Sequence, residues 1–220
     1  MSYRVVLLFL LMCLVVNSHQ PRIAQESDLI VVENPEISKA YYGELKGEPA
    51  TYTFSSEQEI NIYINLLVPY TGTEKHEVFS AELLDAEGKQ VALLDGYEHN
   101  WTTFYEEFGQ DTYWKGPELG EDFKSTGKIP AGTYYIKVFN ENNTGKYVLA
   151  VGDKESFPIT EIINAIITVP IIKFVFFGKP EMLIFALLFI VGIGVAVYFL
   201  VTRKKIKKKK KRKELLAHSS

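Results

Sequence analysis

Cysteine is almost absent from this sequence, since its 220 residues include only Cys13, which lies in an apolar run near the N-terminus. The remainder of the chain can therefore form no internal disulfide and no thiolate metal site. Histidine is nearly as scarce, with four residues, and the His-x-x-x-His and His-Glu-x-x-His spacings of zinc enzymes are both missing. The Gly-x-Ser-x-Gly motif of serine hydrolases and the Asp-x-Asp-x-Asp spacing of calcium loops are missing too. We therefore predict a protein that is not an enzyme and that has no cofactor and no metal site.

The small net charge of −3 conceals two oppositely charged blocks. Between His19 and Pro180 there are 25 acidic and 13 basic residues, a balance of −12. Arg203–Ser220 has ten basic residues and one acidic residue, a balance of +9. The acidic block is also rich in aromatic residues, so we expect it to fold around a core rather than stay disordered.

Residues 1–18 have the form of a secretory signal peptide. Arg4 supplies a positive start, Val5–Val16 is a twelve-residue apolar run, and Asn17 and Ser18 end it. We place the cleavage point after Ser18. The alternative is an uncleaved N-terminal anchor, but twelve residues are short for a membrane span.

Residues 181–202 are predicted to form a transmembrane helix. Met182–Val201 contains twenty residues without a charge, which at about 1.5 Å per residue covers the roughly 30 Å hydrocarbon core. Basic residues beside a span remain on the cytoplasmic side. We therefore expect a single-pass protein of the plasma membrane, with its N-terminal domain outside and the polybasic tail 203–220 in the cytoplasm.

The basic tail is interpreted as a topology signal that also contacts anionic membrane lipid. Basic residues near an anionic surface each contribute about 1 kcal/mol of attraction. Nucleic-acid binding is disfavoured because the run is tethered at the bilayer and has no interleaved aromatic residues. The residues assigned to topology and lipid contact are Arg203, Lys204, Lys205, Lys207 and Lys208.

Residues 156–180 are strongly apolar and are predicted to form a juxtamembrane helix. A second span is disfavoured, because it would return the basic tail to the outside and because Pro170 and Lys173 interrupt the apolar run. Two interpretations stay open. The helix either lies in the outer membrane interface with Phe174, Phe176 and Phe177 partly immersed, or it docks on the domain or on a membrane-protein partner.

A homodimer is a further option for the membrane segment. Gly192 and Ala196 are four residues apart in the span, and small residues at this spacing let two helices approach closely.

The segment 19–155 is predicted to be an extracytoplasmic domain of antiparallel strands. "EINIYINL" alternates apolar and polar residues, as do "TYYIKVF" and "KYVLAV", which is the pattern of half-buried strands. "NENNTG" and "DAEGK" are turn sequences that predict hairpins. Further candidate strands are Leu29–Val32, Ala40–Leu45, Ala50–Phe54, Val78–Leu84 and Gln90–Leu94. About eight short strands with regular turns predict an all-β, jelly-roll-like β-sandwich.

Three stretches carry a resemblance to a known family: "YTFSSEQEINIYINL", "AELLDAEGKQVALLD" and "IPAGTYYIKVFNENNTGKYVLAVG". In this order they resemble the pre-peptidase C-terminal type of domain of bacteria and archaea, over about Ala50–Gly152. The resemblance implies a non-catalytic accessory module of secreted enzymes. This chain departs from the pattern, since no protease domain precedes the match and the stretch Gly96–Lys128 is longer than the pattern suggests.

That longer stretch is the candidate binding face. It combines many carboxylates with aromatic residues that could stack on a sugar ring or a protein partner. The candidate ligand-binding residues are Tyr97, Trp101, Tyr105, Tyr113 and Trp114. The alternative is a long loop that covers one end of the domain with its aromatic residues packed inward.

Asn100 and Asn142 each begin an Asn-x-Thr acceptor for N-glycosylation, and both fall in predicted loops.

Together these features predict a membrane-anchored binding or adhesion module for surface glycan or protein. The alternative is an accessory subunit of a membrane-protein complex that is held through residues 160–201.

Overall fold

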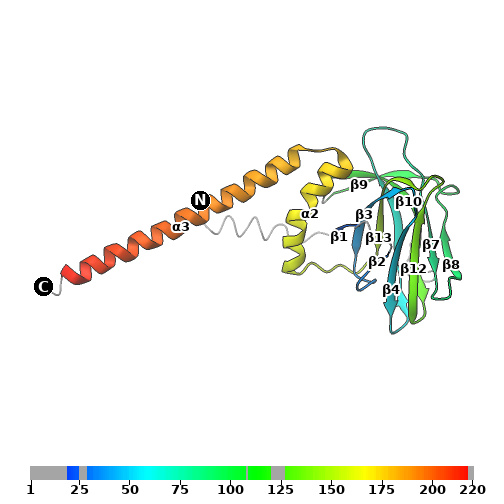
Figure 1. Ribbon diagram of the computed structural model, residues 1–220, viewed down its shortest axis with the longest axis horizontal. Coiled ribbons are helices and arrows are strands. Elements are labelled where there is room, and N and C mark those ends of the chain that lie inside the picture. Colours follow the sequence, from blue (N-terminus) through cyan, green and yellow to red (C-terminus); the bar gives the residue numbers. More distant parts are fainter. Residues whose placement is uncertain (1–18, 25–28, 108, 120–126, 218–220) are drawn as a thin grey trace.

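The computed structural model describes residues 19–24, 29–107, 109–119 and 127–217. It consists of a β-rich domain followed by two helices, of which the second extends away from the domain (Figure 1). The described part of the domain forms two main sheets and one short two-stranded sheet.

Sheet A contains six strands: β1 (Gln20–Ile23), β3 (Lys39–Lys46), β6 (Ile64–Pro69), β9 (Thr102–Glu106), β10 (Asp111–Leu119) and β13 (Thr144–Val151). Their order across the sheet is β1-β3-β13-β6-β10-β9. Sheet B contains five strands: β2 (Ile30–Val31), β4 (Ala50–Ser56), β7 (Ser80–Leu84), β8 (Gln90–Leu94) and β12 (Gly132–Phe139). Their order is β2-β4-β12-β7-β8, and β5 (Ile60–Asn61) pairs separately with β11 (Lys128–Ile129).

One hydrophobic core lies between sheets A and B. Successive side chains of a strand point to opposite faces, so the alternating residues of the sequence fall on the core side. Leu66 and Leu149 of sheet A and Ile136 of sheet B are completely buried in this core. The hydroxyl groups of Tyr52 and Tyr147, one from each sheet, are 2.8 Å apart, so their buried polar atoms are hydrogen-bonded.

The turn after Asn140 differs from the prediction of a hairpin. β12 belongs to sheet B and β13 belongs to sheet A, so the turn carries the chain from one sheet to the other. The apolar sides of β12 and β13 therefore face each other across the core instead of lying side by side. The Asn140 side chain closes the turn by donating to the carbonyl of Thr144 at 2.7 Å and accepting from its amide at 3.0 Å. The other predicted hairpin, at Asp85–Lys89, is confirmed between β7 and β8.

The sheets are mixed rather than purely antiparallel. β1 pairs with β3 and β2 pairs with β4 in parallel. The reason is that the chain passes alternately between the sheets, from β1 in A to β2 in B and back to β3 in A. A strand that returns to its sheet after such a crossover, and pairs there with the previous strand of the same sheet, runs parallel to that strand.

Two segments of the domain differ from their predicted form. The alternating stretch from Glu59 to Leu66 is divided into β5 and β6, which belong to different sheets. The stretch Gly96–Lys128 is not a long loop, because its described residues include β9 and β10, which pair as a hairpin and extend sheet A. Strand β1, which has little alternation, was not predicted.

Helix α2 (Ile159–Phe177) follows the domain, and α3 (Glu181–Ala217) follows α2. Gly178 ends α2 in the left-handed conformation, with φ 65°, and donates its backbone N–H to the carbonyl of Lys173. By length and composition alone, α2 and the Glu181–Arg203 part of α3 are both apolar enough to cross a membrane. The helix continues from that part through the basic run to Ala217.

Candidate functional site

The predicted ligand-binding residues do not form one surface. Tyr97 and Tyr105 are exposed, whereas Tyr113 is buried on the outer face of sheet A, the face turned away from the core. Trp101 and Trp114 pack against the core between the sheets. The five residues therefore lie in three different environments.

The two tryptophans form a packed cluster with His76. The His76 ring stacks on Trp114, with ring centroids 4.4 Å apart, and lies 5.1 Å from the ring centroid of Trp101. The indole N–H of Trp101 donates to the carbonyl of Gly96 at 2.8 Å. Burial lowers the pKa of His76, which favours its neutral form between the two rings. This arrangement favours packing over an open binding face at these tryptophans.

The outer face of sheet A is covered in part by the C-terminal half of α2. Ile172, Phe176 and Phe177 are buried there against the strand residues Ala40, Tyr42, Leu67, Tyr113, Val148 and Ala150. Phe176 meets Tyr42 edge-on, with ring centroids 5.3 Å apart, and Phe177 meets Tyr113 in the same way at 5.3 Å. Of the two interpretations left open by the sequence, immersion in the membrane interface does not hold for Phe176 and Phe177, because sheet A buries both rings as docking on the domain requires.

A buried ionic cluster holds the same end of α2. Lys173 donates to the Asp111 carboxylate and to the backbone carbonyl of Gly109. Its side chain is only 7 % exposed and that of Asp111 only 3 % exposed. Lys179, in the link to α3, donates to the other carboxylate oxygen of Asp111 at 2.8 Å. One acidic residue at the start of β10 thus contacts both the end of α2 and the link that follows it.

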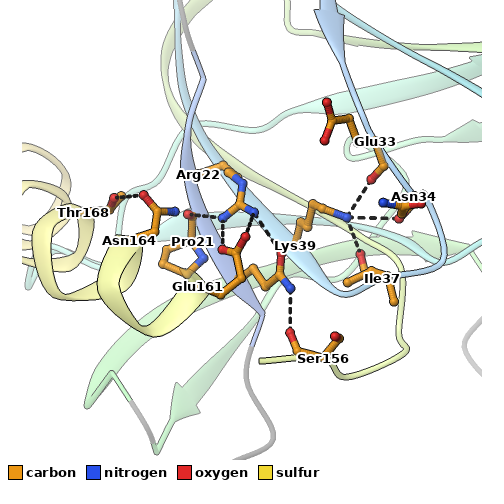
Figure 2. Close-up of polar contacts among 11 residues, drawn as sticks. Pro21, Arg22, Glu33, Asn34, Ile37, Lys39, Ser156, Glu161, Asn164 and Thr168 are labelled. Atoms are coloured by element: carbon orange, nitrogen blue, oxygen red, sulfur yellow. Dashed lines mark hydrogen bonds and ion pairs between the residues drawn. The ribbon is translucent and has the colours of Figure 1, made fainter. Parts of the chain in front are cut away.

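A second ionic contact holds the beginning of α2 (Figure 2). Arg22 of β1 binds the Glu161 carboxylate with two hydrogen bonds, of 2.8 and 2.9 Å. The Gln20 side chain donates to the carbonyl of Ser156 at 2.6 Å, just before the helix begins. Bidentate pairs of arginine and carboxylate fix geometry as well as charge. Strand β1 therefore attaches α2 to the edge of sheet A.

Lys39 lies close to this contact and is 5 % exposed. Its ammonium group donates to the carbonyls of Glu33, Asn34 and Ile37 at 2.7, 3.0 and 3.3 Å (Figure 2). Burial lowers the pKa of Lys39, and the nearby positive charge of Arg22 lowers it further. Through these three hydrogen bonds, Lys39 holds the segment between β2 and β3 in place.

A groove of about 160 Å³ crosses the part of sheet A that borders α2. Its lining combines aromatic rings with paired polar groups: His19, Ala40, Tyr42, Tyr63, Asn65, Leu67, Phe104, Glu106, Tyr113, Lys115 and Val148. The charge of Lys115 is matched by Glu118 at 2.7 Å, and the Tyr63 hydroxyl donates to the same carboxylate at 2.8 Å. Because Glu118 already neutralises Lys115, the groove is better suited to an uncharged polar ligand than to an anion.

Tyr63 and Phe104, which line this groove, were not among the predicted site residues. Phe104 lies in the predicted binding stretch, but the sequence did not show that β9 would place it beside β10. Tyr63 lies outside that stretch and reaches the groove from the break before β6. Within the described residues, no group of three His, Cys, Asp or Glu side chains is arranged to hold a metal ion.

The remaining predicted positions are two glycosylation acceptors and five basic residues. Asn100 and Asn142 are both exposed. Arg203, Lys204, Lys205, Lys207 and Lys208 all belong to the last part of α3.

Comparison with solved structures places a pre-peptidase C-terminal domain among the neighbours of this chain. The domain, from a collagenase of Bacillus anthracis, is 14% identical, with a TM-score of 0.32, and the match covers 59% of this chain and 97% of that one. The catalytic domain of a GH87 α-1,3-glucanase in complex with nigerose is 13% identical over 53% of this chain and 22% of its own, with a TM-score of 0.28. No family model and no curated protein matches the sequence. The first neighbour agrees with the resemblance drawn from the sequence.

Proposed function

We propose that this protein is a single-pass, membrane-anchored binding module without catalytic activity. In this proposal the two sheets form an extracytoplasmic jelly-roll-like β-sandwich and α3 crosses the plasma membrane. The basic tail then lies in the cytoplasm and contacts anionic lipid. The ligand is a glycan or a protein that is bound at the membrane surface.

The observation that carries the proposal is the direct connection of the domain to α3. Seven residues separate β13 from α2, and Lys154 within them pairs with Ile37 in a parallel bridge. Three residues then separate α2 from α3. Because α2 is itself attached to sheet A at both ends, no flexible stalk separates the domain from the apolar helix. Such a module would act close to the bilayer rather than reach away from it.

The groove and the neighbouring edge strand β9 supply the candidate ligand surface. Phe104 lines the groove and is 44% exposed, and Tyr105 next to it is 55% exposed on the other face of β9. Exposed aromatic rings beside matched polar groups suit a sugar ring or a protein side chain. An enzyme is not proposed, because Lys115 is paired with Glu118 and Glu106 accepts the backbone N–H of Gly109.

The test uses full-length protein in nanodiscs, a panel of oligosaccharides, and in-cell crosslinking followed by mass spectrometry. Phe104→Ala should weaken binding of a captured glycan or protein by about tenfold or more, as expected for loss of an aromatic anchor. Leu93→Ala, on the edge strand of sheet B, is the matched control, because Leu93 is 46% exposed. Equal effects of the two variants, or capture of nothing by the domain, would contradict the proposal.

The second candidate is an accessory subunit of a membrane complex held through residues 160–201. It is favoured by the large exposed apolar surface of α2 and α3, which includes Ile163, Ile167 and Ile184. Pairing of two copies through Gly192 and Ala196 is one form of this candidate. Crosslinks from a stoichiometric membrane partner to these helices, with none to β9, would favour it.

Two further parts of the proposal have direct tests. The tail should be cleaved by protease only after the membrane is opened, because it lies inside. In a host with N-glycosylation, removal of Asn100 and Asn142 should abolish any shift in mass on deglycosylation.

A further inference from the structure

Helix α2 places its charged residues on the opposite side from a helix on the surface of a water-soluble domain. Such helices normally direct their apolar side toward the core and their charged side toward water. In α2 both charged residues point toward the domain, where Glu161 binds Arg22 and Lys173 binds Asp111. Asn164 and Thr168 are half-buried and are hydrogen-bonded to each other at 3.2 Å.

The opposite side of α2 is a continuous apolar stripe. Its members recur every three or four residues and are each 38–76% exposed: Ile159, Ile163, Ile166, Ile167, Ile171 and Phe174. None of them can form a side-chain hydrogen bond. Exposing such a row to water is unfavourable by roughly 25 cal/mol per Å² of apolar surface, so a non-aqueous medium should cover the stripe.

We propose that the apolar stripe of α2 lies in the outer leaflet of the bilayer that α3 crosses. This inference rests on the membrane anchor of the proposed function and adds a second contact between the domain and lipid. The stripe would continue the lipid-facing surface of α3, since only Gly178, Lys179 and Pro180 separate the two helices.

The composition of the stripe favours lipid over a protein partner. Helices that pair in membranes approach through Gly, Ala, Ser and Thr, whereas the stripe consists of isoleucines and one phenylalanine. Of the small residues of α2, Ala165 and Thr168 are half-buried on the side that faces the domain, whereas Thr160, in the first turn, is exposed. Beyond that first turn the stripe lacks the residues that would let a second helix pack closely.

The attraction between the stripe of α2 and the bilayer would be apolar rather than electrostatic. The segment His19–Pro180 has a net charge of −12, so an anionic membrane surface repels it as a whole. Lys146, at the rim of the contact, is occupied by the carbonyl of Val175 at 2.8 Å. Neutral phosphatidylcholine should therefore be sufficient for insertion.

The experiment places single cysteines in full-length protein whose Cys13 is replaced by serine. An environment-sensitive fluorophore is attached at Ile163→Cys, Ile167→Cys or Ile171→Cys, and the protein is reconstituted in phosphatidylcholine nanodiscs. Ile190→Cys in α3 is the membrane control. Glu87→Cys, in the exposed turn between β7 and β8, is the water control.

The three stripe labels should show blue-shifted emission, and nitroxide lipids labelled near the headgroup should quench them several-fold more than the label at residue 87. The label at residue 190 should be quenched best by nitroxides deep in the chains. Addition of phosphatidylglycerol should leave the quenching at the stripe unchanged.

Two results would overturn the inference while leaving the membrane anchor intact. In one, residue 190 contacts lipid but the stripe labels behave like residue 87. In the other, the stripe labels are shielded from both water and lipid, and the same cysteines, left unlabelled, form disulfides with a second copy under mild oxidation. A label at residue 190 that contacts no lipid would instead contradict the proposed function itself.

Discussion

Replacement of Asp111 by alanine should destabilise the attachment of α2 more than removal of any exposed ion pair. The Lys173 ammonium group would remain buried without its carboxylate, and breaking a buried pair in this way costs about 3–5 kcal/mol. Burial of Ile172, Phe176 and Phe177 contributes roughly 1.5–3 kcal/mol per residue as an upper estimate. The cost of the lost ion pair is thus a large fraction of the roughly 4.5–9 kcal/mol that burial of the three apolar residues contributes. We expect α2 to become only weakly docked.

The assay is thermal unfolding of the full-length protein in nanodiscs, together with hydrogen exchange along α2. A loss of 3–5 kcal/mol corresponds to a decrease in Tm of roughly 10 °C for a domain of this size. Amides of α2 near Lys173 should exchange faster. Glu59→Ala is the control, because its pair with Lys128 is exposed at both ends and is worth at most about 1 kcal/mol. The double variant Asp111→Leu with Lys173→Met should recover most of the loss, since an apolar pair can replace a buried ion pair. If Asp111→Ala were as mild as Glu59→Ala, the buried pair would not exist in the folded protein.

The remaining predictions concern the first strand, the core and the response to pH. Burial lowers the pKa of His19 to about 4 from the ordinary 6.5, so the unfolded chain binds a proton that the folded chain excludes. The contribution of neutral His19 to stability should therefore be fully present above pH 6.5 and be lost as the pH decreases toward 4. His19→Gln should flatten this part of a plot of Tm against pH. An unchanged slope would refute the lowered pKa of His19. Gly96→Ala should destabilise the domain by about 1–3 kcal/mol in denaturant unfolding, because the added Cβ would lie 1.9 Å from the backbone oxygen of Phe79; an unaffected midpoint would show that the two segments are farther apart. Arg22→Ala should cost about 1–2 kcal/mol and speed hydrogen exchange at the start of α2, and Glu161→Gln should have a similar but smaller effect; normal protection in both would contradict the contact.

The local pattern of the sequence predicted most strands but not their partners. Alternating residues located β12, β13 and the beginning of β6, because one side of each strand is buried. The same alternation results whether two strands pair in one sheet or face each other across a core. The turn after Asn140 was for this reason assigned to a hairpin, although it links the two sheets. Only contacts between distant segments distinguish the two cases.

The position of α2 shows a similar limit. The apolar residues of the helix and the interruptions at Pro170 and Lys173 were visible in the sequence. A helical projection would have placed Glu161 away from the stripe but not Lys173, because Lys173 follows Ile166 by seven residues and projects about 20° from it. What no local pattern contained was the partner of Lys173, because Asp111 lies 62 residues earlier in the chain. For the same reason the sequence grouped Tyr113 with exposed aromatic residues, although α2 covers it.

The proposed lipid contact would give the position of the charges on α2 and the buried cluster at Asp111 a common physical cause. A helix whose outer side lies in lipid cannot turn a lysine outward without a large cost, so its charge must be matched on the protein side. Asp111 meets this need for Lys173, and its second oxygen binds Lys179 in the link to α3. One carboxylate at the start of β10 therefore joins sheet A, α2 and the link to α3. It follows that β10, which also lines the groove, would be the part of the domain most directly affected by a movement of α3.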